Sequence, residues 1–222
     1  MEGLPGSSQA ALNEIVKNLK NVVKLLVFTS RDENGYVQCP ACEDTAALIV
    51  QLSKMTDKIN AEEISTITDK EKCEKYGVTR HPTILLPDFN IRYTGAPIGL
   101  ELSPFVQTVL MASTGETILG DLGADQVSSI KKGSLIIIVT PTCPYCAQAV
   151  LMENSLAIDS GGKISVEIVE AYENPDIAKK YQVTGVPVTV VNKKEKIVGV
   201  PNFALLLQKL KGDKSSLNEM YS

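Results

Sequence analysis

The sequence contains two Cys-Pro-x-Cys motifs, at residues 39–42 and 143–146, which begin 104 residues apart in a chain of 222. A cysteine thiolate can attack a disulfide, and a second cysteine three residues later can then displace the attacking sulfur from its partner. This exchange moves electrons in pairs and requires no metal or organic cofactor. The two motifs therefore predict thiol–disulfide chemistry at two centres.

Other landmarks repeat together with the motifs. Each motif is followed, 43 or 44 residues later, by the proline that ends a Lys-Tyr-x-Val-Thr-x-x-Pro phrase, at residues 75–82 and 180–187. Gly-Ala-Pro at residues 95–97 and Gly-Val-Pro at residues 199–201 are again offset by 104 residues. A single CxxC motif is a weak signal, but several landmarks recurring in one order indicate a duplicated unit.

The length fits such a duplication, because 222 residues correspond to two domains of about 110 residues each. We expect one unit over residues 1–117 and a second over residues 118–222, since several glycines separate the two halves between Ser113 and Gly123. Apolar residues make up 44% and charged residues 22% of the chain, which is typical of a globular protein with sizeable cores.

Charge and hydropathy exclude some classes of function. The net charge is −4 and no basic run stands out, so we expect no nucleic-acid partner. No stretch approaches the ~20 apolar residues that span a bilayer, and the N-terminus lacks the pattern of a signal peptide. These features predict a cytoplasmic protein without membrane contact. In a reducing compartment, paired cysteines are more often catalytic or metal-binding than structural.

Hydrophobic periodicity predicts the order β-α-β-α-β-β-α in each half, with one additional helix in front. The predicted helices cover residues 7–20, 40–57, 70–76, 103–112, 124–131, 144–158, 175–181 and 204–210. The predicted strands cover residues 22–28, 62–68, 83–87, 90–94, 135–140, 164–169, 188–191 and 196–200. Each CxxC motif thus lies where the first strand of its unit leads into a helix. The strand at 90–94 is expected to lie at an edge.

This order, with CxxC at the first strand-to-helix junction, resembles the thioredoxin fold. The doubled version, with Val-Thr-Pro-Thr-Cys-Pro-Tyr-Cys at residues 139–146, resembles the archaeal-type protein disulfide oxidoreductases, also called glutaredoxin-like proteins. The resemblance covers essentially the whole chain. It implies an α/β fold of two tandem thioredoxin-like units, each with a central mixed sheet flanked by helices. It also implies an enzyme that reduces, forms or isomerises disulfides in client proteins.

The position of each motif assigns roles to its cysteines. Free backbone N–H groups and the positive end of the helix dipole stabilise a thiolate at a helix start. We therefore expect Cys39 and Cys143 to be the attacking thiols, and Cys42 and Cys146 to be the resolving thiols. The proline that follows each attacking cysteine fits this placement, because proline is favoured at the first helical position.

The resemblance further implies that Pro82 and Pro187 are cis and lie beside the thiols. A proline presents no N–H to the sulfur, and the residues before it, His81 and Val186, would offer backbone groups to an extended client segment. His81 is the only histidine in the chain. It could tune the first centre by hydrogen bonding or charge near Cys39, or merely flank the proline.

The sequence departs from the related families at several points. Thioredoxins have a buried acid on the strand leading into the motif, whereas both such strands here have none. Glu63 and Glu167, on the next strands, could transfer protons instead or be solvated. Gly185 stands where glutaredoxins have a threonine, so we do not expect glutathione as an obligatory substrate. Cys73 has no partner in the repeat and is expected to be a packed or surface thiol.

Several alternatives stay open at this point. The four motif cysteines could form a zinc site, although each pair precedes its own long helix. One motif could be catalytic, with the other either an inactive remnant of the duplication or a site that only passes electrons on. The chain could carry electrons between a thioredoxin-reductase-like flavoenzyme and a peroxiredoxin, but the related amino-terminal regions of peroxiredoxin reductases usually keep one CxxC. It could also be a chaperone-like module. We expect the second motif to be the more active or more reducing centre, since its Pro-Tyr pair matches glutaredoxins.

Overall fold

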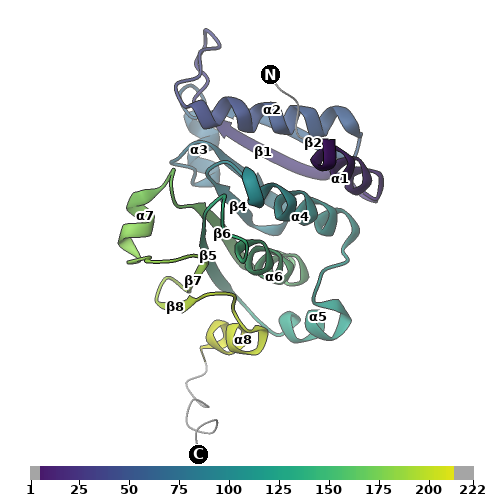
Figure 1. The fold of residues 1–222 in the computed structure, drawn as a ribbon, viewed down its shortest axis with the longest axis vertical. Coiled ribbons are helices and arrows are strands. Elements are labelled where there is room, and N and C mark those ends of the chain that lie inside the picture. The colour runs from purple at the N-terminus through teal and green to yellow at the C-terminus, as the bar shows by residue number, and fades with distance from the viewer. Residues whose placement is uncertain (1–5, 213–222) are drawn as a thin grey trace, which may run out of the picture.

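The computed structural model describes residues 6–212, which form two thioredoxin-like units around one shared sheet (Figure 1). The first unit contains α1 (Gly6–Lys17), β1 (Val23–Thr29), α2 (Pro40–Met55), β2 (Ile59–Ser65), α3 (Lys70–Tyr76), β3 (Thr83–Leu86), η1 (Pro87–Phe89), β4 (Ile91–Thr94), η2 (Gly99–Glu101) and α4 (Leu102–Thr114). The second contains α5 (Gly120–Ser128), β5 (Gly133–Val139), α6 (Cys146–Asp159), β6 (Ile164–Glu170), α7 (Pro175–Lys180), β7 (Val188–Val191), β8 (Glu195–Val198) and α8 (Phe203–Lys211).

The predicted α/β fold and the repeated element order are confirmed. The largest differences in element position are at β2, which starts three residues before its predicted range, and at α5, which starts four residues early. Residues 115–119 connect α4 to α5; the division at residue 117 stays a prediction. Within residues 6–212, no helix combines the length and the apolar composition needed to cross a bilayer.

The eight strands form one sheet in the order β2-β1-β3-β4-β6-β5-β7-β8. The two halves join through β4 and β6, which pair in parallel from Ile91 opposite Val166 to Thr94 opposite Val169. The prediction that residues 90–94 form an edge strand is therefore wrong. The guanidinium of Arg92 in this strand donates to two backbone carbonyls at the end of α3.

The two faces of the sheet are covered differently. Helices α1, α2, α4, α5, α6 and α8 lie on one face, whereas α3 and α7 lie on the other (Figure 1). On the six-helix face, one apolar core runs through both units, from Leu12 in α1 to Leu210 in α8. On the opposite face, each unit has its own small core. The six-helix face therefore holds the two units together.

Helix α6 is the most enclosed helix, because it lies between the sheet and neighbouring helices of both units (Figure 1). Its consecutive polar residues Glu153, Asn154 and Ser155 are all fully buried. The amide of Asn154 donates to the hydroxyls of Tyr93 and Thr108 in the first unit, both at 2.9 Å. The junction between the units thus contains a buried polar network as well as apolar contacts.

Candidate active site

The first cysteine pair lies at the start of α2, as predicted. Pro40 is the first helical residue and Cys39 is the N-cap, and the backbone amide of Cys42 donates to the Cys39 sulfur at 3.2 Å. Cys39 is partly exposed, whereas Cys42 is buried. The helix start therefore directs a hydrogen-bond donor and its positive end at the sulfur that solvent can reach.

The buried member of the pair is held by Ser30, at the end of β1. The Ser30 hydroxyl donates to the Cys42 sulfur at 3.8 Å and accepts from the Cys39 backbone amide at 2.9 Å. Burial raises the pKa of Cys42 to about 12, and its hydrogen bond with Cys39 acts in the same direction. Cys42 is therefore a thiol at neutral pH, and the accessible sulfur of the pair is that of Cys39.

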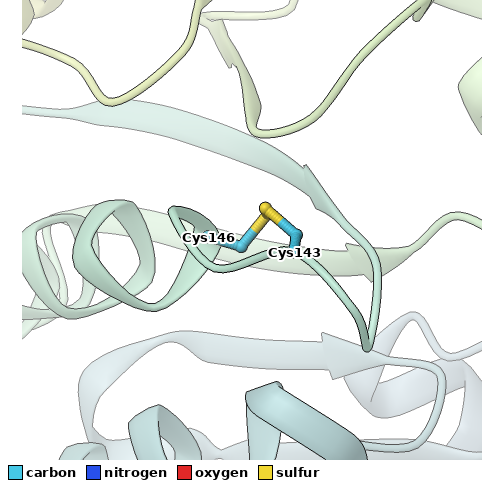
Figure 2. Close-up of a disulfide and its surroundings, with 2 residues drawn as sticks. All are labelled: Cys143 and Cys146. Atoms are coloured by element: carbon cyan, nitrogen blue, oxygen red, sulfur yellow. A yellow bond between two sulfur atoms is a disulfide. The ribbon is translucent and has the colours of Figure 1, made fainter.

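The second pair forms a disulfide between Cys143 and Cys146, whose side chains point toward each other at the start of α6 (Figure 2). Here the helix begins at Cys146, with Tyr145 as its N-cap. The prediction that Pro144 is the first helical residue is therefore wrong. In the disulfide the Cys143 sulfur is bonded to Cys146, so it does not cap the helix as the free Cys39 thiol does. Cys143 is 5% exposed, while Tyr145 between the cysteines is 65% exposed.

Both prolines of the repeated phrase are cis, as the resemblance implied: the bonds are His81-Pro82 and Val186-Pro187. The thiol of Cys39 lies 3.8 Å from the carbonyl oxygen of His81, which places the first proline loop beside the first pair. The His81 ring contacts the Thr66 hydroxyl through Nδ1 at 2.9 Å, and burial lowers the pKa of this histidine. Val186 at the matching position has no polar side chain.

A cavity of about 460 Å³ lies between α3 and His81, and neither cysteine of the first pair lines it. It is lined by residues of α3 and its flanking turns, including Thr66, Lys70, Cys73, Val78 and His81. Cys73 is buried in the small core under α3, and this burial raises the pKa of its thiol. Cys73 is therefore a packed thiol, as expected.

The acids considered from sequence do not contact a cysteine in the described part of the chain. Glu63 is exposed and pairs with Arg31 at 2.9 Å. Glu167 is partly buried and accepts a hydrogen bond from Thr94, at 2.8 Å. Both carboxylates are therefore engaged with partners on the sheet.

The sequence did not indicate three buried acids, Glu101, Glu153 and Glu170. The carboxylate of Glu170 accepts from two backbone amides of the turn that follows it, whereas the other two lack a partner for at least one carboxylate oxygen among the described residues. Glu153 in α6 is fully buried; Thr189 donates to one of its carboxylate oxygens, and the other has no partner. Burial raises its pKa to about 8. Glu101 in η2 is 2% exposed, and neither carboxylate oxygen has a hydrogen-bond partner. Burial, and then the nearby charge of Glu170, raise its pKa to about 7.

Glu101 belongs to the first unit, and the helical turn that contains it contacts the segment that leads to the second pair. The amide of its neighbour Leu100 donates to the carbonyl of Pro141, two residues before Cys143, at 2.8 Å. A small cavity is lined by Glu101 together with Val139, the last residue of the strand that leads to the second pair. No repeat landmark points to Glu101, because its burial comes from the contact between the units.

Comparison with known proteins places this geometry in a family. The profile of the thioredoxin domain matches residues 135–211. A probable thioredoxin of Archaeoglobus fulgidus is 35% identical over 79 residues, which are 34% of this chain and 87% of that protein. A crystal structure of a protein disulfide oxidoreductase from Aeropyrum pernix is 31% identical, covers 95% of this chain and 94% of its own, and superposes with a TM-score of 0.85. The chain belongs to the protein disulfide oxidoreductases.

As a member of this family, the protein is a thiol–disulfide oxidoreductase with tandem thioredoxin folds. The doubled fold also occurs in the N-terminal domain of alkylhydroperoxide reductase AhpF from Enterococcus faecalis, with a TM-score of 0.82 and 21% identity over 94% of this chain and 100% of that one. At this identity the likeness shows the shared fold only. The alternative of one zinc site made by all four motif cysteines is not supported, since Cys143 and Cys146 are bonded to each other.

Proposed function

We propose that the protein exchanges electron pairs with disulfides and dithiols of client proteins, through Cys39–Cys42 and Cys143–Cys146. The geometry of the first pair supports this proposal most directly. The accessible Cys39 sulfur accepts a hydrogen bond from a backbone amide at the start of α2, and the buried thiol of Cys42 lies beside it. This arrangement places a hydrogen-bond donor at the accessible Cys39 sulfur and keeps the proton on Cys42.

At the first centre, the Cys39 thiolate attacks one sulfur of a client disulfide. The other client sulfur leaves as a thiolate and takes up a proton, and a mixed disulfide forms between Cys39 and the client. Cys42 then loses its proton and attacks the Cys39 sulfur. The client is released with both cysteines reduced, and the pair ends as a Cys39–Cys42 disulfide. The reverse sequence oxidises a client dithiol.

At the second centre, Cys143 and Cys146 perform the same steps, and we assign proton transfer to Glu101. Reduction of the Cys143–Cys146 disulfide produces two thiols, so protons must reach a site that is largely closed to water. Glu101 lines a small cavity together with Val139, the last residue of the strand that leads to this pair, and a carboxyl with a pKa of about 7 can both accept and donate a proton at neutral pH. This buried acid replaces the one missing from the preceding strand.

Clients are proposed to bind beside the cis-proline loops. There, the backbone groups of His81 and Val186 are available to an extended client segment, as in other sites that bind peptides in a strand-like conformation. Pro82 and Pro187 hold these groups in place and contribute no N–H that would compete for the sulfur. At the first centre, the cavity under His81 offers space for a client side chain.

The direct test is reduction of insulin disulfides by variants with one pair each. We expect Cys143→Ser to lower the rate more than Cys39→Ser does, because the second pair is proposed to be the more reducing centre. Redox titration of each pair, with the other pair replaced by serine, gives the two reduction potentials and shows directly which pair is the more reducing. Full activity of Cys143→Ser together with loss of activity in Cys39→Ser would show that the first pair is the principal centre.

Two other functions predict different results. A dedicated carrier between a thioredoxin-reductase-like flavoenzyme and a peroxiredoxin would accept electrons from a thioredoxin reductase and pass few to insulin. A chaperone-like module would suppress aggregation of unfolded clients even when all four motif cysteines are replaced. The proposed enzyme instead reduces insulin with dithiothreitol alone and loses this activity in the four-cysteine variant.

A further inference from the structure

A second chemistry is available at the first centre, which contains a set of metal ligands. The sulfur atoms of Cys39 and Cys42 and a ring nitrogen of His81 all lie within 4.8 Å of one another. Within residues 6–212, no other group of three or more histidine, cysteine or acidic side chains lies close enough to hold an ion. Thiolate sulfur and imidazole nitrogen are the ligands that Zn²⁺ takes in proteins, at about 2.3 and 2.0–2.1 Å.

Nδ1 of His81 is already engaged in a hydrogen bond. It lies 2.9 Å from the Thr66 hydroxyl oxygen, which also lies 3.0 Å from the Thr29 carbonyl oxygen. When Nδ1 carries the ring proton and donates it to this hydroxyl, the lone pair is on Nε2, the nitrogen that then remains for a metal. A donor bond from the other ring nitrogen is the usual support of a histidine ligand.

The spacing of the three atoms fits a tetrahedral ion with small movements. Two sulfur ligands of one zinc ion lie about 3.8 Å apart, as follows from a bond length of about 2.3 Å in tetrahedral geometry. The observed upper limit of 4.8 Å is about 1 Å larger, a difference that rotation of the exposed His81 and the partly exposed Cys39 side chains can close while the buried Cys42 stays in place. The fourth position would face solvent, because His81 is exposed and Cys39 is partly exposed.

The second centre provides the contrast. Its two cysteines are bonded to each other, and Val186 occupies the position of His81 before the cis-proline. Even when reduced, this centre offers two sulfur ligands and no imidazole. The duplication therefore produced two similar dithiols, of which only the first has a third ligand.

We propose that the reduced first centre binds one Zn²⁺ through Cys39 Sγ, Cys42 Sγ and His81 Nε2, with water as the fourth ligand. Zinc is bound by thiolates, so any protons that the two sulfurs carry are released on binding, and no electrons are transferred. The same sulfurs cannot hold zinc and form a disulfide at once. Zinc therefore holds the first centre reduced and blocks its exchange with clients, while the second centre stays free to react.

The test measures zinc on the full chain carrying Cys143→Ser and Cys146→Ser, reduced and freed of metal. Elemental analysis is expected to give one zinc per chain, and competition with a chromophoric chelator gives its affinity. The matched control carries Cys39→Ser and Cys42→Ser, so that only the reduced second pair remains. This control is expected to bind zinc at least tenfold more weakly. Equal affinity in the two proteins would overturn the proposal, since any dithiol would then suffice.

Substitutions at the third ligand separate coordination from folding. In the chain that keeps only the first pair, His81→Val introduces the residue of the second centre and is expected to lower zinc affinity at least tenfold. His81→Cys restores a ligand atom and is expected to retain tight binding. Thr66→Val removes the support of the ring and should weaken binding about tenfold. Unchanged affinity in His81→Val, or equal losses in His81→Val and His81→Cys, would show that His81 is not a ligand.

Discussion

Replacement of Glu101 by glutamine tests the buried acid at the junction of the two units. Its pKa is raised from an ordinary value of 4.5 to about 7, chiefly by burial. Since one pKa unit corresponds to about 1.4 kcal/mol, the ionised carboxylate destabilises the folded protein by about 3 kcal/mol. Because the folded-state pKa lies above that of the unfolded chain, this penalty is absent below pH 4.5. It grows between pH 4.5 and 7, and it is complete above pH 7.

We therefore expect Glu101→Gln to be more stable than the wild type at pH 8, by up to about 3 kcal/mol, and nearly equal to it at pH 4.5. Urea unfolding at several pH values, with all proteins in one redox state, measures the difference. Glu153→Gln is the matched control, because Glu153 is also buried and its pKa is raised to about 8. Glu153→Gln should also be more stable than the wild type at high pH, and its gain in unfolding free energy should grow from pH 4.5 up to about pH 8.

The two variants are expected to differ in catalysis. In chains that keep only the second cysteine pair, Glu101→Gln should slow insulin reduction and remove the dependence of the rate on a group titrating near pH 7. General acid–base catalysis typically contributes 10²–10⁴-fold, which sets the scale of the loss. Glu153→Gln should leave that pH profile in place. If only Glu153→Gln changed the profile, or if the stability of Glu101→Gln showed no pH-dependent gain, the reasoning about Glu101 would be refuted.

Three further changes probe the junction between the units. Tyr93→Phe removes a buried hydroxyl and leaves the amide of Asn154 with fewer partners; we expect a loss of about 1–3 kcal/mol in unfolding free energy by urea denaturation. Arg80→Ala removes a pair with Asp176 that spans the units at 3.0 Å but is largely exposed, so the same measurement should show less than about 1 kcal/mol. Gly99 has a φ of +60°, and Gly99→Ala would place a Cβ 2.6 Å from the backbone oxygen of Pro141, two residues before Cys143. It should lower the activity of the second pair more than that of the first, measured in single-pair chains.

The sequence predicted most of what each unit contains, because those features depend on local residues. The periodicity of apolar residues located the strands and helices, and the resemblance to thioredoxins implied the cis bonds at Pro82 and Pro187. The N-cap role of Cys39 followed from the position of its motif between a strand and a helix. The corresponding prediction for the second helix start was wrong. A CxxC motif does not show whether its two cysteines are free or joined in a disulfide, as they are at the second centre.

What the sequence did not predict arises where one unit meets the other. Glu153 and Asn154 look like residues of a solvated helix face, yet they are buried because α6 is covered by helices of both units. In the same way, the strand expected at an edge, β4, lies in the middle of the sheet, and its Arg92 is half-buried. Each of these polar side chains has at least one hydrogen-bond partner that is distant in sequence, so no local pattern could reveal its burial.

The linear order of the sheet also explains why a duplicated sequence yields unequal centres. Strand β4 lies in the middle of the sheet. The segment that follows it contacts the loop of the second cysteine pair, because the Leu100 amide donates to the Pro141 carbonyl. The matching turn after β8 follows an edge strand, which pairs only with β7 among the described residues. The first unit can therefore contribute an acid near the second centre, whereas among residues 6–212 the turn after β8 forms no matching backbone hydrogen bond with the first unit. The first centre differs instead through its own residues, above all His81 where the second has Val186.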